Sequence, residues 1–186
     1  PLPEPSTGHT THISTVDADG NAVGITTSLG ESCGLLAGDS GVVLNNFLGE
    51  ADVNPPDSPR EAGHRLMTMC CPTLLERDGQ VFVMGSGGSS RIRSAVLHGL
   101  VYLTDHRMSP GRAADSPRAH VEGTVTSVEL KGRPEGLREV LEDVLEDVRW
   151  FEGQNMFFGG LNIAGKAGSE FVGAGDSRRS GCFEKA

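Results

Sequence analysis

Apolar and polar positions alternate with a period of two along several short segments, which is typical of strands that bury one face. Two pairs of segments are joined by turn residues, Asp19-Gly20-Asn21 and Arg77-Asp78-Gly79, so each pair predicts a hairpin. The predicted strands cover residues 11–17, 21–29, 42–44, 72–76, 80–84, 125–130, 161–164 and 170–174.

The period changes after residue 90. Apolar residues then recur every three to four positions on one helical face, at Ile92, Ala95, Val96, Gly99, Leu100 and Leu103. A short helix is predicted at 110–114, and a longer one at 134–150, where a proline opens an apolar stripe flanked by acids. Glycines at 30–41 and prolines at 53–65 predict loops. Hairpins followed by grouped helices indicate an α+β fold, and 186 residues suit one domain.

Charge and cysteine content narrow the class of protein. The formal net charge is −9 and no basic stripe is present, so a nucleic-acid partner is not expected. No apolar run reaches the length of a membrane span. Cys33, Cys70, Cys71 and Cys182 lack the CxxC spacing of a zinc or redox site, and we interpret them as buried or idle thiols. No compartment is assigned, because any targeting signal would lie upstream of Pro1.

The first strand begins with Thr10 and Thr11, and this start has two interpretations. In the first, β-branched residues simply begin an extended segment. In the second, cleavage of the peptide before Thr10 creates a new N-terminus, whose α-amine deprotonates the hydroxyl of the same residue. Thr10 would then supply both nucleophile and base. Taken alone, the stretch favours the first interpretation.

A glycine- and serine-rich loop at 85–90 lies between a predicted strand and a predicted helix. Backbone N–H groups at such a point can bind an anion. The spacing misses the dinucleotide fingerprint at Ser90, and the loop has no P-loop lysine, so nucleotide binding is not expected. A tight turn and an oxyanion hole for acyl transfer both remain open.

The remaining motifs add little chemistry. The six histidines are scattered, so no metal site is predicted, and no G-x-S-x-G motif indicates a serine hydrolase. Asp176 and Arg178 are predicted to form a structural ion pair.

Six motifs follow one another in order along the chain. They are Thr10-Thr11-His12-Ile13-Ser14-x-Val16-Asp17-x-Asp19-Gly20-Asn21, Ser40-Gly41-Val42-Val43-Leu44-Asn45-Asn46, Cys71-Pro72-Thr73, Gly85-Ser86-Gly87-Gly88-Ser89-Ser90-Arg91-Ile92, Ser116-Pro117-Arg118-Ala119-His120 and Gly175-Asp176-Ser177-Arg178. Together they resemble the small, catalytic subunit of the γ-glutamyltranspeptidase family, over nearly the whole chain from Thr10.

The resemblance implies an N-terminal nucleophile hydrolase with a four-layer αββα sandwich of antiparallel sheets and helices, and no cofactor. It implies that a precursor cleaves itself between His9 and Thr10, so that 1–9 form an unstructured leader and 10–186 the catalytic small subunit. Thr10 is then the nucleophile, with its freed amine as base. Ser28 falls where the family has a hydroxyl bonded to the nucleophile, and the amides of Gly88 and Ser89 fall at the oxyanion hole.

The substrate-binding positions of the family carry different residues in this chain. The matching positions are Gly30, Asn46, Phe47, Glu50, Met67 and Thr68. The family holds the α-amine of a γ-glutamyl group with an Asn, a Glu or Gln, and an Asp, where this chain has Gly30, Phe47 and Glu50. Met67 and Thr68 match two serines that bind the carboxylate. Glu50 alone keeps a charge suited to an ammonium group, so the resemblance supports acyl transfer more firmly than γ-glutamyl specificity.

We therefore expect an N-terminal-threonine amidohydrolase or acyltransferase that cleaves small γ-glutamyl, glutathione-like amides and passes the acyl group from Thr10 to water or an amine. The alternatives are an acylase of the same fold that acts on another amide, and a non-catalytic fragment or binding module. The resemblance also implies a partner, the large subunit from the same precursor, which supplies an arginine for the substrate carboxylate.

Overall fold

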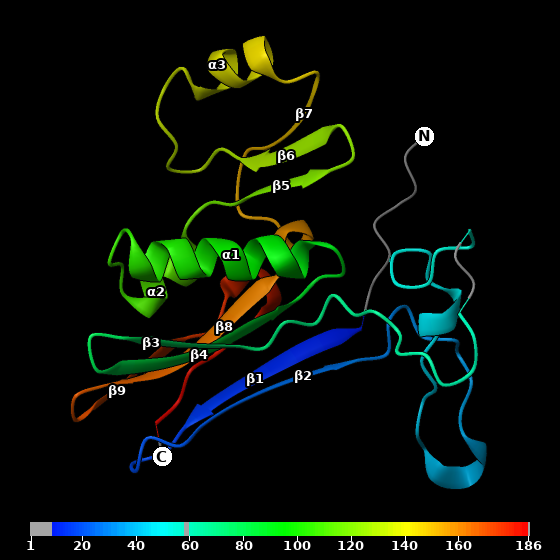
Figure 1. Cartoon of the computed structure of the whole chain (residues 1–186). Coiled ribbons are helices and arrows are strands. Elements are labelled where there is room, and N and C mark those ends of the chain that lie inside the picture. Colours follow the sequence, from blue (N-terminus) through cyan, green and yellow to red (C-terminus); the bar gives the residue numbers. More distant parts are fainter. Residues whose placement is uncertain (1–8, 58–59, 186) are drawn as a thin grey trace.

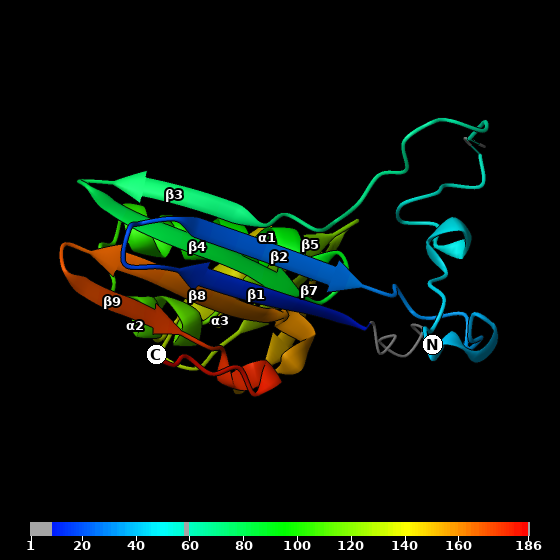
Figure 2. The same ribbon diagram turned by 90° about the horizontal axis from the view of Figure 1, so that it is seen from below.

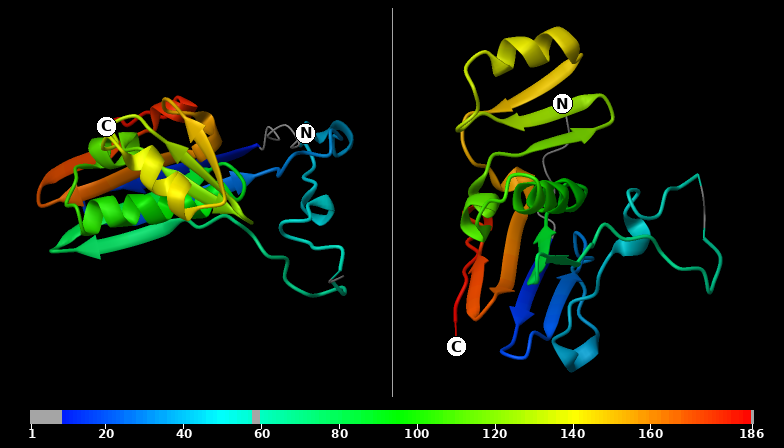
Figure 3. Two further views of the ribbon diagram at one scale, coloured as in Figure 1. Left: turned by 90° about the horizontal axis from the view of Figure 1, so that it is seen from above. Right: turned by 60° about the vertical axis from the view of Figure 1, so that its left-hand side comes forward.

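The computed structural model describes residues 9–57 and 60–185, so the predicted leader lies outside the described residues except for His9. The elements are stacked in layers (Figures 1 and 3). A two-stranded hairpin, a four-stranded sheet and two helices follow one another, and a three-stranded sheet with a third helix lies beyond the helices. Within the described residues, no helix has the length and apolar character needed to cross a membrane.

The first predicted hairpin is confirmed. β1 (Thr10–Val16) and β2 (Ala22–Ser28) are antiparallel, and Thr10 lies opposite Ser28 at the open end. Because side chains alternate between the two faces of a strand, even-numbered residues of both strands point one way and odd-numbered residues the other. The even-numbered side chains are buried or half-buried, whereas the odd-numbered ones are exposed.

The second predicted hairpin is confirmed and forms one side of the larger sheet. β3 (Thr73–Arg77), β4 (Gln80–Gly87), β8 (Gly160–Ala167) and β9 (Glu170–Ala174) lie in that order, and all neighbours are antiparallel. The β1–β2 hairpin lies across β4 and β8 on one face of this sheet (Figure 2). Thr10 is thereby brought to the end of β4.

Two helices cover the opposite face of the four-stranded sheet, as predicted. α1 (Arg91–Thr104) and α2 (Pro110–Asp115) pack on β4, β8 and β9. The core between them consists of Phe82, Met84, Val96, Leu103, Ala113, Leu161 and Ile163. Gly99 permits the close approach of α1 to β8, because a β-carbon at this position would come within 2.7 Å of a Leu161 methyl group.

The predicted helix over 134–150 is wrong in its extent. α3 covers only Leu137–Val144, and the chain then enters β7 (Asp147–Phe151), which runs parallel to β6 (Val125–Glu129). β6 also pairs with β5 (Ala119–Glu122), a strand that the sequence pattern missed. Polar and apolar residues alternate along 147–151, so its period of two matches a strand once β6 is available as a neighbour.

The predicted strand at 42–44 is also wrong. Val43 forms a single isolated bridge with Leu36, and Val42 and Leu44 are exposed. This segment belongs to a long excursion between β2 and β3, which extends away from the sheets (Figure 1). Within the described residues the excursion contains two single-turn helices, η1 (Gly38–Ser40) and η2 (Phe47–Gly49).

The α+β prediction is confirmed, and the described residues form β, β and α layers in turn. No described helix packs on the outer face of the β1–β2 hairpin. Three apolar side chains of that face are about half exposed: Ile13 at 55%, Val23 at 50% and Ile25 at 54%. The hairpin is therefore polar toward the larger sheet and apolar toward the outside, the reverse of a hairpin that closes a domain.

Candidate active site

The site begins with two hydroxyl groups at the open end of the β1–β2 hairpin. Thr10 Oγ1 and Ser28 Oγ are 2.7 Å apart, within hydrogen-bond distance. Ser28 Oγ also accepts the N–H of Gly30 at 3.0 Å. The geometry thus places the two hydroxyls that the sequence assigned to the nucleophile and its neighbour in direct contact.

The glycine- and serine-rich loop forms the turn from β4 into α1, beside Thr10. The Thr10 carbonyl packs against Gly87, where a β-carbon would collide with it. Gly88 and Ser89 have φ values of +136° and +53°, so the turn accepts the serine side chain in a left-handed conformation. In the described part of the chain, the amides of Gly88 and Ser89 donate no hydrogen bond. Ser89 lines the cavity described below, and Gly88 is buried beside it.

The back of this turn rests on a second pair of glycines. A β-carbon on Gly88 would lie 2.9 Å from the α-carbon of Gly159, and one on Gly159 would lie 2.7 Å from the Gly87 carbonyl. Gly160 donates its N–H to Ser86 Oγ at 3.2 Å. The turn is therefore supported by backbone on both sides.

A buried ion network holds this second glycine pair. Arg118 donates to the carbonyls of Phe158 and Gly159 and pairs with Asp176 at 2.5 Å. Asp176 is fully buried and also pairs with Arg178, which confirms the predicted tie between these two residues. The sequence motifs included Arg118 without assigning it a partner, and they did not include Glu129, which pairs with Arg178 at 2.6 Å. These partners are far apart in the chain, so only the fold brings them together.

One cavity collects most of the predicted site residues. It is lined by Thr10, Ser28, Gly30, Glu31, Phe47, Glu50, Asp52, Val53, Thr68, Met69, Cys70, Ser89 and Ile92. Met67 is not among them and is 56% exposed, whereas Met69, which the sequence did not single out, lines the cavity. Gly88 and Asn46 lie beside the cavity: Gly88 adjoins Ser89 in the turn, and Asn46 bonds Glu31.

Gly30 and Glu50 are coupled in this cavity. Gly30 has a φ of +62°, and a β-carbon there would collide with the Glu50 carboxylate and lie 2.6 Å from Asn46 Oδ1. The carboxylate and the amide oxygen both accept the N–H of Glu31, at 2.9 and 2.8 Å. The space that a side chain at position 30 would occupy is therefore filled by the acid at position 50.

The cavity is acidic. Three carboxylates line it, from Glu31, Glu50 and Asp52, and no lysine or arginine is among its described lining residues. The described lining therefore carries negative side chains and no positive one, an electrostatic environment that favours a cationic group over a carboxylate.

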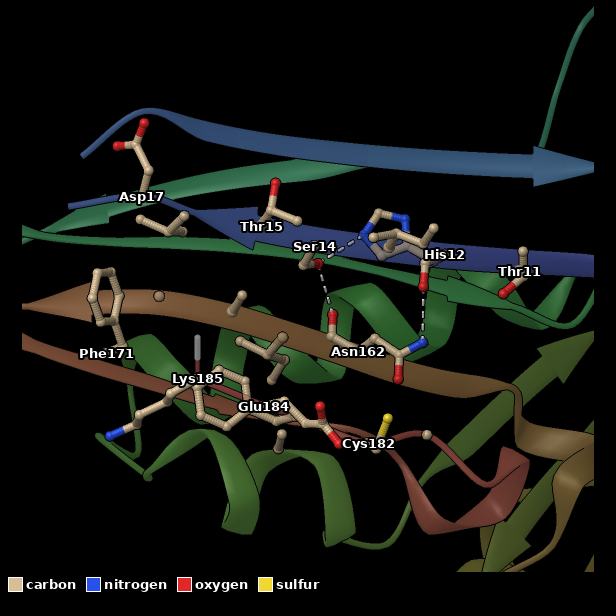
Figure 4. A pocket seen from close by; sticks show the side chains of 18 of the residues that line it. Thr11, His12, Ser14, Thr15, Asp17, Asn162, Phe171, Cys182, Glu184 and Lys185 are labelled. Carbon is tan, nitrogen blue, oxygen red and sulfur yellow. Dashed lines mark hydrogen bonds between the residues drawn. The ribbon is translucent and has the colours of Figure 1, made fainter. Parts of the chain in front are cut away.

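His12 lies two residues beyond Thr10 on the same face of β1, and Figure 4 shows its ring beside Ser14. Its Nδ1 is 2.7 Å from Thr26 Oγ1 and its Nε2 is 2.9 Å from Ser14 Oγ, which donates to the Asn162 carbonyl on β8. Burial lowers the pKa of His12. Its ring nitrogens connect β1 to β2 through Thr26 and, through Ser14, to the Asn162 carbonyl on β8.

The cysteines and possible metal ligands contribute little to the site. All four cysteines are free thiols, and Cys33 and Cys182 are exposed, so of the two predicted alternatives, buried or idle, burial does not hold for these two. Burial raises the pKa of Cys71, whose neighbour Cys70 lines the cavity. Within residues 9–57 and 60–185, no group of three His, Cys, Asp or Glu side chains is placed to hold a metal ion.

Comparison with known proteins places this geometry in context. The chain is 31% identical over 160 residues to the glutathione hydrolase proenzyme of Escherichia coli, a match that covers 71% of this chain and 28% of that protein. It is 33% identical over 137 residues to the acylase ACY 1 proenzyme of Pseudomonas sp. strain SE83, which covers 71% of this chain and 24% of the acylase. The chain therefore spans about a quarter of these curated relatives.

Solved structures agree in fold. The γ-glutamyltranspeptidase of Pseudomonas nitroreducens, complexed with L-DON, superposes with a TM-score of 0.79 at 23% identity, covering 95% of this chain and 99% of that one. The transpeptidase CapD of Bacillus anthracis gives 0.74 at 27% identity, with coverage of 95% and 99%. The family model described as gamma-glutamyltranspeptidase matches residues 3–185. An acylase is also among the curated relatives of this chain. The chain thus belongs to the γ-glutamyltranspeptidase family.

Proposed function

We propose that this chain is the catalytic part of an N-terminal-threonine amidohydrolase or acyltransferase. The observation that carries the proposal is the contact between the Thr10 and Ser28 hydroxyls in the lining of a cavity that Ser89 also lines. A nucleophile, a hydroxyl that orients it and unbonded amides are the parts that acyl transfer requires.

The first half of the reaction forms an acyl-enzyme. After cleavage of the His9–Thr10 bond, the α-amine of Thr10 accepts the proton of its own hydroxyl, and Oγ1 attacks the amide carbonyl of the substrate. The negative charge that develops on the carbonyl oxygen is held by the amides of Gly88 and Ser89. The C–N bond then breaks, the α-ammonium returns its proton to the leaving amine, and an acyl-threonine ester remains.

The second half releases the acyl group. Water or an amine attacks the ester, and the α-amine of Thr10 takes the proton of the attacking group. The C–O bond to Thr10 breaks, and Oγ1 recovers that proton. Ser28 stays in contact with Oγ1 throughout and fixes its direction.

The proposed acyl donor is a small γ-glutamyl amide such as glutathione. The acidic lining supports this choice, because Glu50, held by the Glu31 amide, is placed to accept an ammonium group. A carboxylate of the donor would need a counterion from elsewhere. The exposed apolar face of the β1–β2 hairpin supports a large subunit from the same precursor as the partner that supplies it.

A second donor class is supported by other observations. Phe47 and Met69 make part of the cavity apolar, and an acylase is among the relatives. A donor without an ammonium group would suit these side chains. Comparing kcat/KM for a γ-glutamyl anilide with that for the glutaryl anilide, which lacks only the α-amino group, separates the two classes.

The test of the acyl mechanism uses the complete precursor. We expect mass spectrometry to find a small chain that begins at Thr10, and an electrophilic acyl-site inactivator to label that residue. The Thr10→Ala variant should remain uncut and unlabelled, while the Thr11→Ala variant, altered at the exposed neighbour, should behave as wild type. A wild-type precursor that is neither cut at His9–Thr10 nor labelled at Thr10 would overturn the proposal.

A further inference from the structure

The peptide bond before Thr10 lies in an irregular part of the β1–β2 hairpin. The register that pairs Thr10 with Ser28 should pair His9 with Leu29. Instead, His9 donates its N–H to the Gly30 carbonyl at 2.8 Å and accepts the Leu29 N–H on its own carbonyl at 3.0 Å. Leu29 and Gly30 thus both face His9, just beyond the last paired residues Thr10 and Ser28; this bulge-like offset, called the bulge below, lies opposite the proposed scissile bond.

The bulge is fixed by the residue type at position 30. Gly30 takes a φ of +62°, which favours glycine, and its carbonyl is the acceptor for His9. Its N–H is held by Ser28 Oγ, the hydroxyl in contact with Thr10. Gly30 is therefore bonded both to Ser28, which contacts the Thr10 hydroxyl, and to His9, which precedes the proposed scissile bond.

The His9 carbonyl is the group on which negative charge would develop during self-cleavage. When Thr10 Oγ1 attacks the carbonyl carbon of His9, the oxygen becomes an oxyanion, and a donor already aimed at it lowers the barrier. The Leu29 amide is such a donor, at 3.0 Å before any reaction. The amides of Gly88 and Ser89 belong to a different strand end, beside the cavity that the substrate would fill.

We propose that self-cleavage uses its own oxyanion donor, the backbone N–H of Leu29 in the bulge, separate from the Gly88–Ser89 amides that serve substrate turnover. This inference rests on the proposed cleavage at His9–Thr10. Thr10 Oγ1 bonds to the His9 carbonyl carbon, the His9–Thr10 C–N bond breaks, and the hydroxyl proton of Thr10 ends on its own nitrogen. The resulting ester is hydrolysed by water to a His9 carboxylate and a Thr10 hydroxyl.

The test removes one N–H from the complete precursor. Replacing Leu29 with its α-hydroxy acid turns that amide into an ester and keeps the side chain. The same exchange at Ile25, farther along β2, is the matched control for the loss of a backbone N–H. We expect the Leu29 ester to release the Thr10 chain about 10²-fold more slowly, within the range found when one oxyanion donor is removed, and the Ile25 ester to cleave at nearly the wild-type rate.

A second pair of variants tests the bulge with ordinary residues. Gly30→Ala adds a β-carbon that collides with the Glu50 carboxylate, whereas Gly20→Ala, in the hairpin turn at φ +88°, meets nothing within 4 Å. Both carry the conformational cost of a positive φ, so comparable loss of stability is expected from that source. Only Gly30→Ala should slow cleavage beyond what its melting temperature explains.

The outcomes separate the inference from the proposed function. If the wild-type precursor does not cleave at His9–Thr10, the proposed function itself fails. If it cleaves and the Leu29 ester cleaves as fast as the Ile25 ester, the Leu29 amide is not the oxyanion donor. Equal slowing of both esters, with equal loss of melting temperature, would assign the effect to hairpin stability and would also overturn the inference.

Discussion

Removal of the Ser28 hydroxyl tests the contact on which the proposed chemistry depends. Ser28 Oγ is 2.7 Å from Thr10 Oγ1 and accepts the Gly30 N–H at 3.0 Å. A hydrogen bond of this kind contributes about 1 kcal/mol net. Ser28→Ala loses both of these hydrogen bonds and leaves the Gly30 N–H without its acceptor. With about 2 kcal/mol of transition-state stabilisation lost, kcat/KM should fall roughly 30-fold.

The assay needs small chains that already begin at Thr10, so that the variant is not limited by its own processing. Production of the two subunits as separate polypeptides provides them. Ser28 orients the nucleophile and does not touch the proposed ammonium site, so we expect the loss in kcat, with KM little changed. Ser28→Thr keeps a hydroxyl and should recover activity to within about threefold of wild type, because the contact energy is largely restored.

The matched control is Thr27→Ala. Thr27 is the adjacent residue of β2, its side chain is exposed, and it points away from the cavity. Ser28→Ala with the same kcat/KM as Thr27→Ala would refute the reasoning, since the contact with Thr10 would then have no part in catalysis.

Three further predictions concern stability. Asp176→Asn breaks a fully buried ion pair and should lower the free energy of unfolding by about 3–5 kcal/mol in urea titration. Asp78→Asn, in an exposed pair with an arginine, should lower it far less, and equal effects would contradict the buried network. Ser89 has a φ of +53°, which glycine adopts with less strain, so Ser89→Gly should raise stability by roughly 0.5–1 kcal/mol and increase the melting temperature. A lower melting temperature would show that the serine side chain is needed. Burial, aided by neighbouring arginines, lowers the pKa of His98 from 6.5 to about 4. Between these two pH values the unfolded state binds a proton that the folded state does not, so stability should fall as the pH drops from about 6.5 to about 4. The His98→Gln variant should show a flatter dependence of stability on pH, and an unchanged dependence would exclude this group.

Local signals account for the elements that the sequence predicted well. Both hairpins were located by Asp and Gly turn residues between short apolar runs, and α1 by its repeated apolar face. The helix over 134–150 failed because the residues of β7 carry enough apolar side chains to continue a helical stripe. Its strand conformation depends on pairing with β6, about 20 residues earlier in the chain, which no local pattern reveals.

In the site, too, local features could be predicted from the sequence, whereas features that depend on distant residues could not. Thr10, Ser28 and the Gly88–Ser89 turn could be found from short motifs, because each depends on a few consecutive residues. The cavity residue Met69 was missed in favour of Met67, since in an irregular segment a shift of two positions changes which side chain faces inward. Arg118 could not be assigned its partner, Asp176, because 58 residues separate them.

In the proposed mechanism, the groups that hold the oxyanions are backbone amides, whereas the groups that hold the substrate are side chains. The proposed oxyanion donors are amides, at Gly88 and Ser89 for the substrate and at Leu29 for self-cleavage, and Ser89 can replace a glycine without loss of its N–H. Substrate contacts depend on side chains, so a change at one position alters the space at another, as Glu50 fills the place left by Gly30. A family with this design can change its acyl donor by exchanging cavity side chains while the strand ends that hold Thr10 keep their geometry. For this chain, the choice of acyl donor therefore depends on Phe47, Glu50 and Met69, and the proposed acyl mechanism depends on Thr10, Ser28 and the Gly88–Ser89 turn.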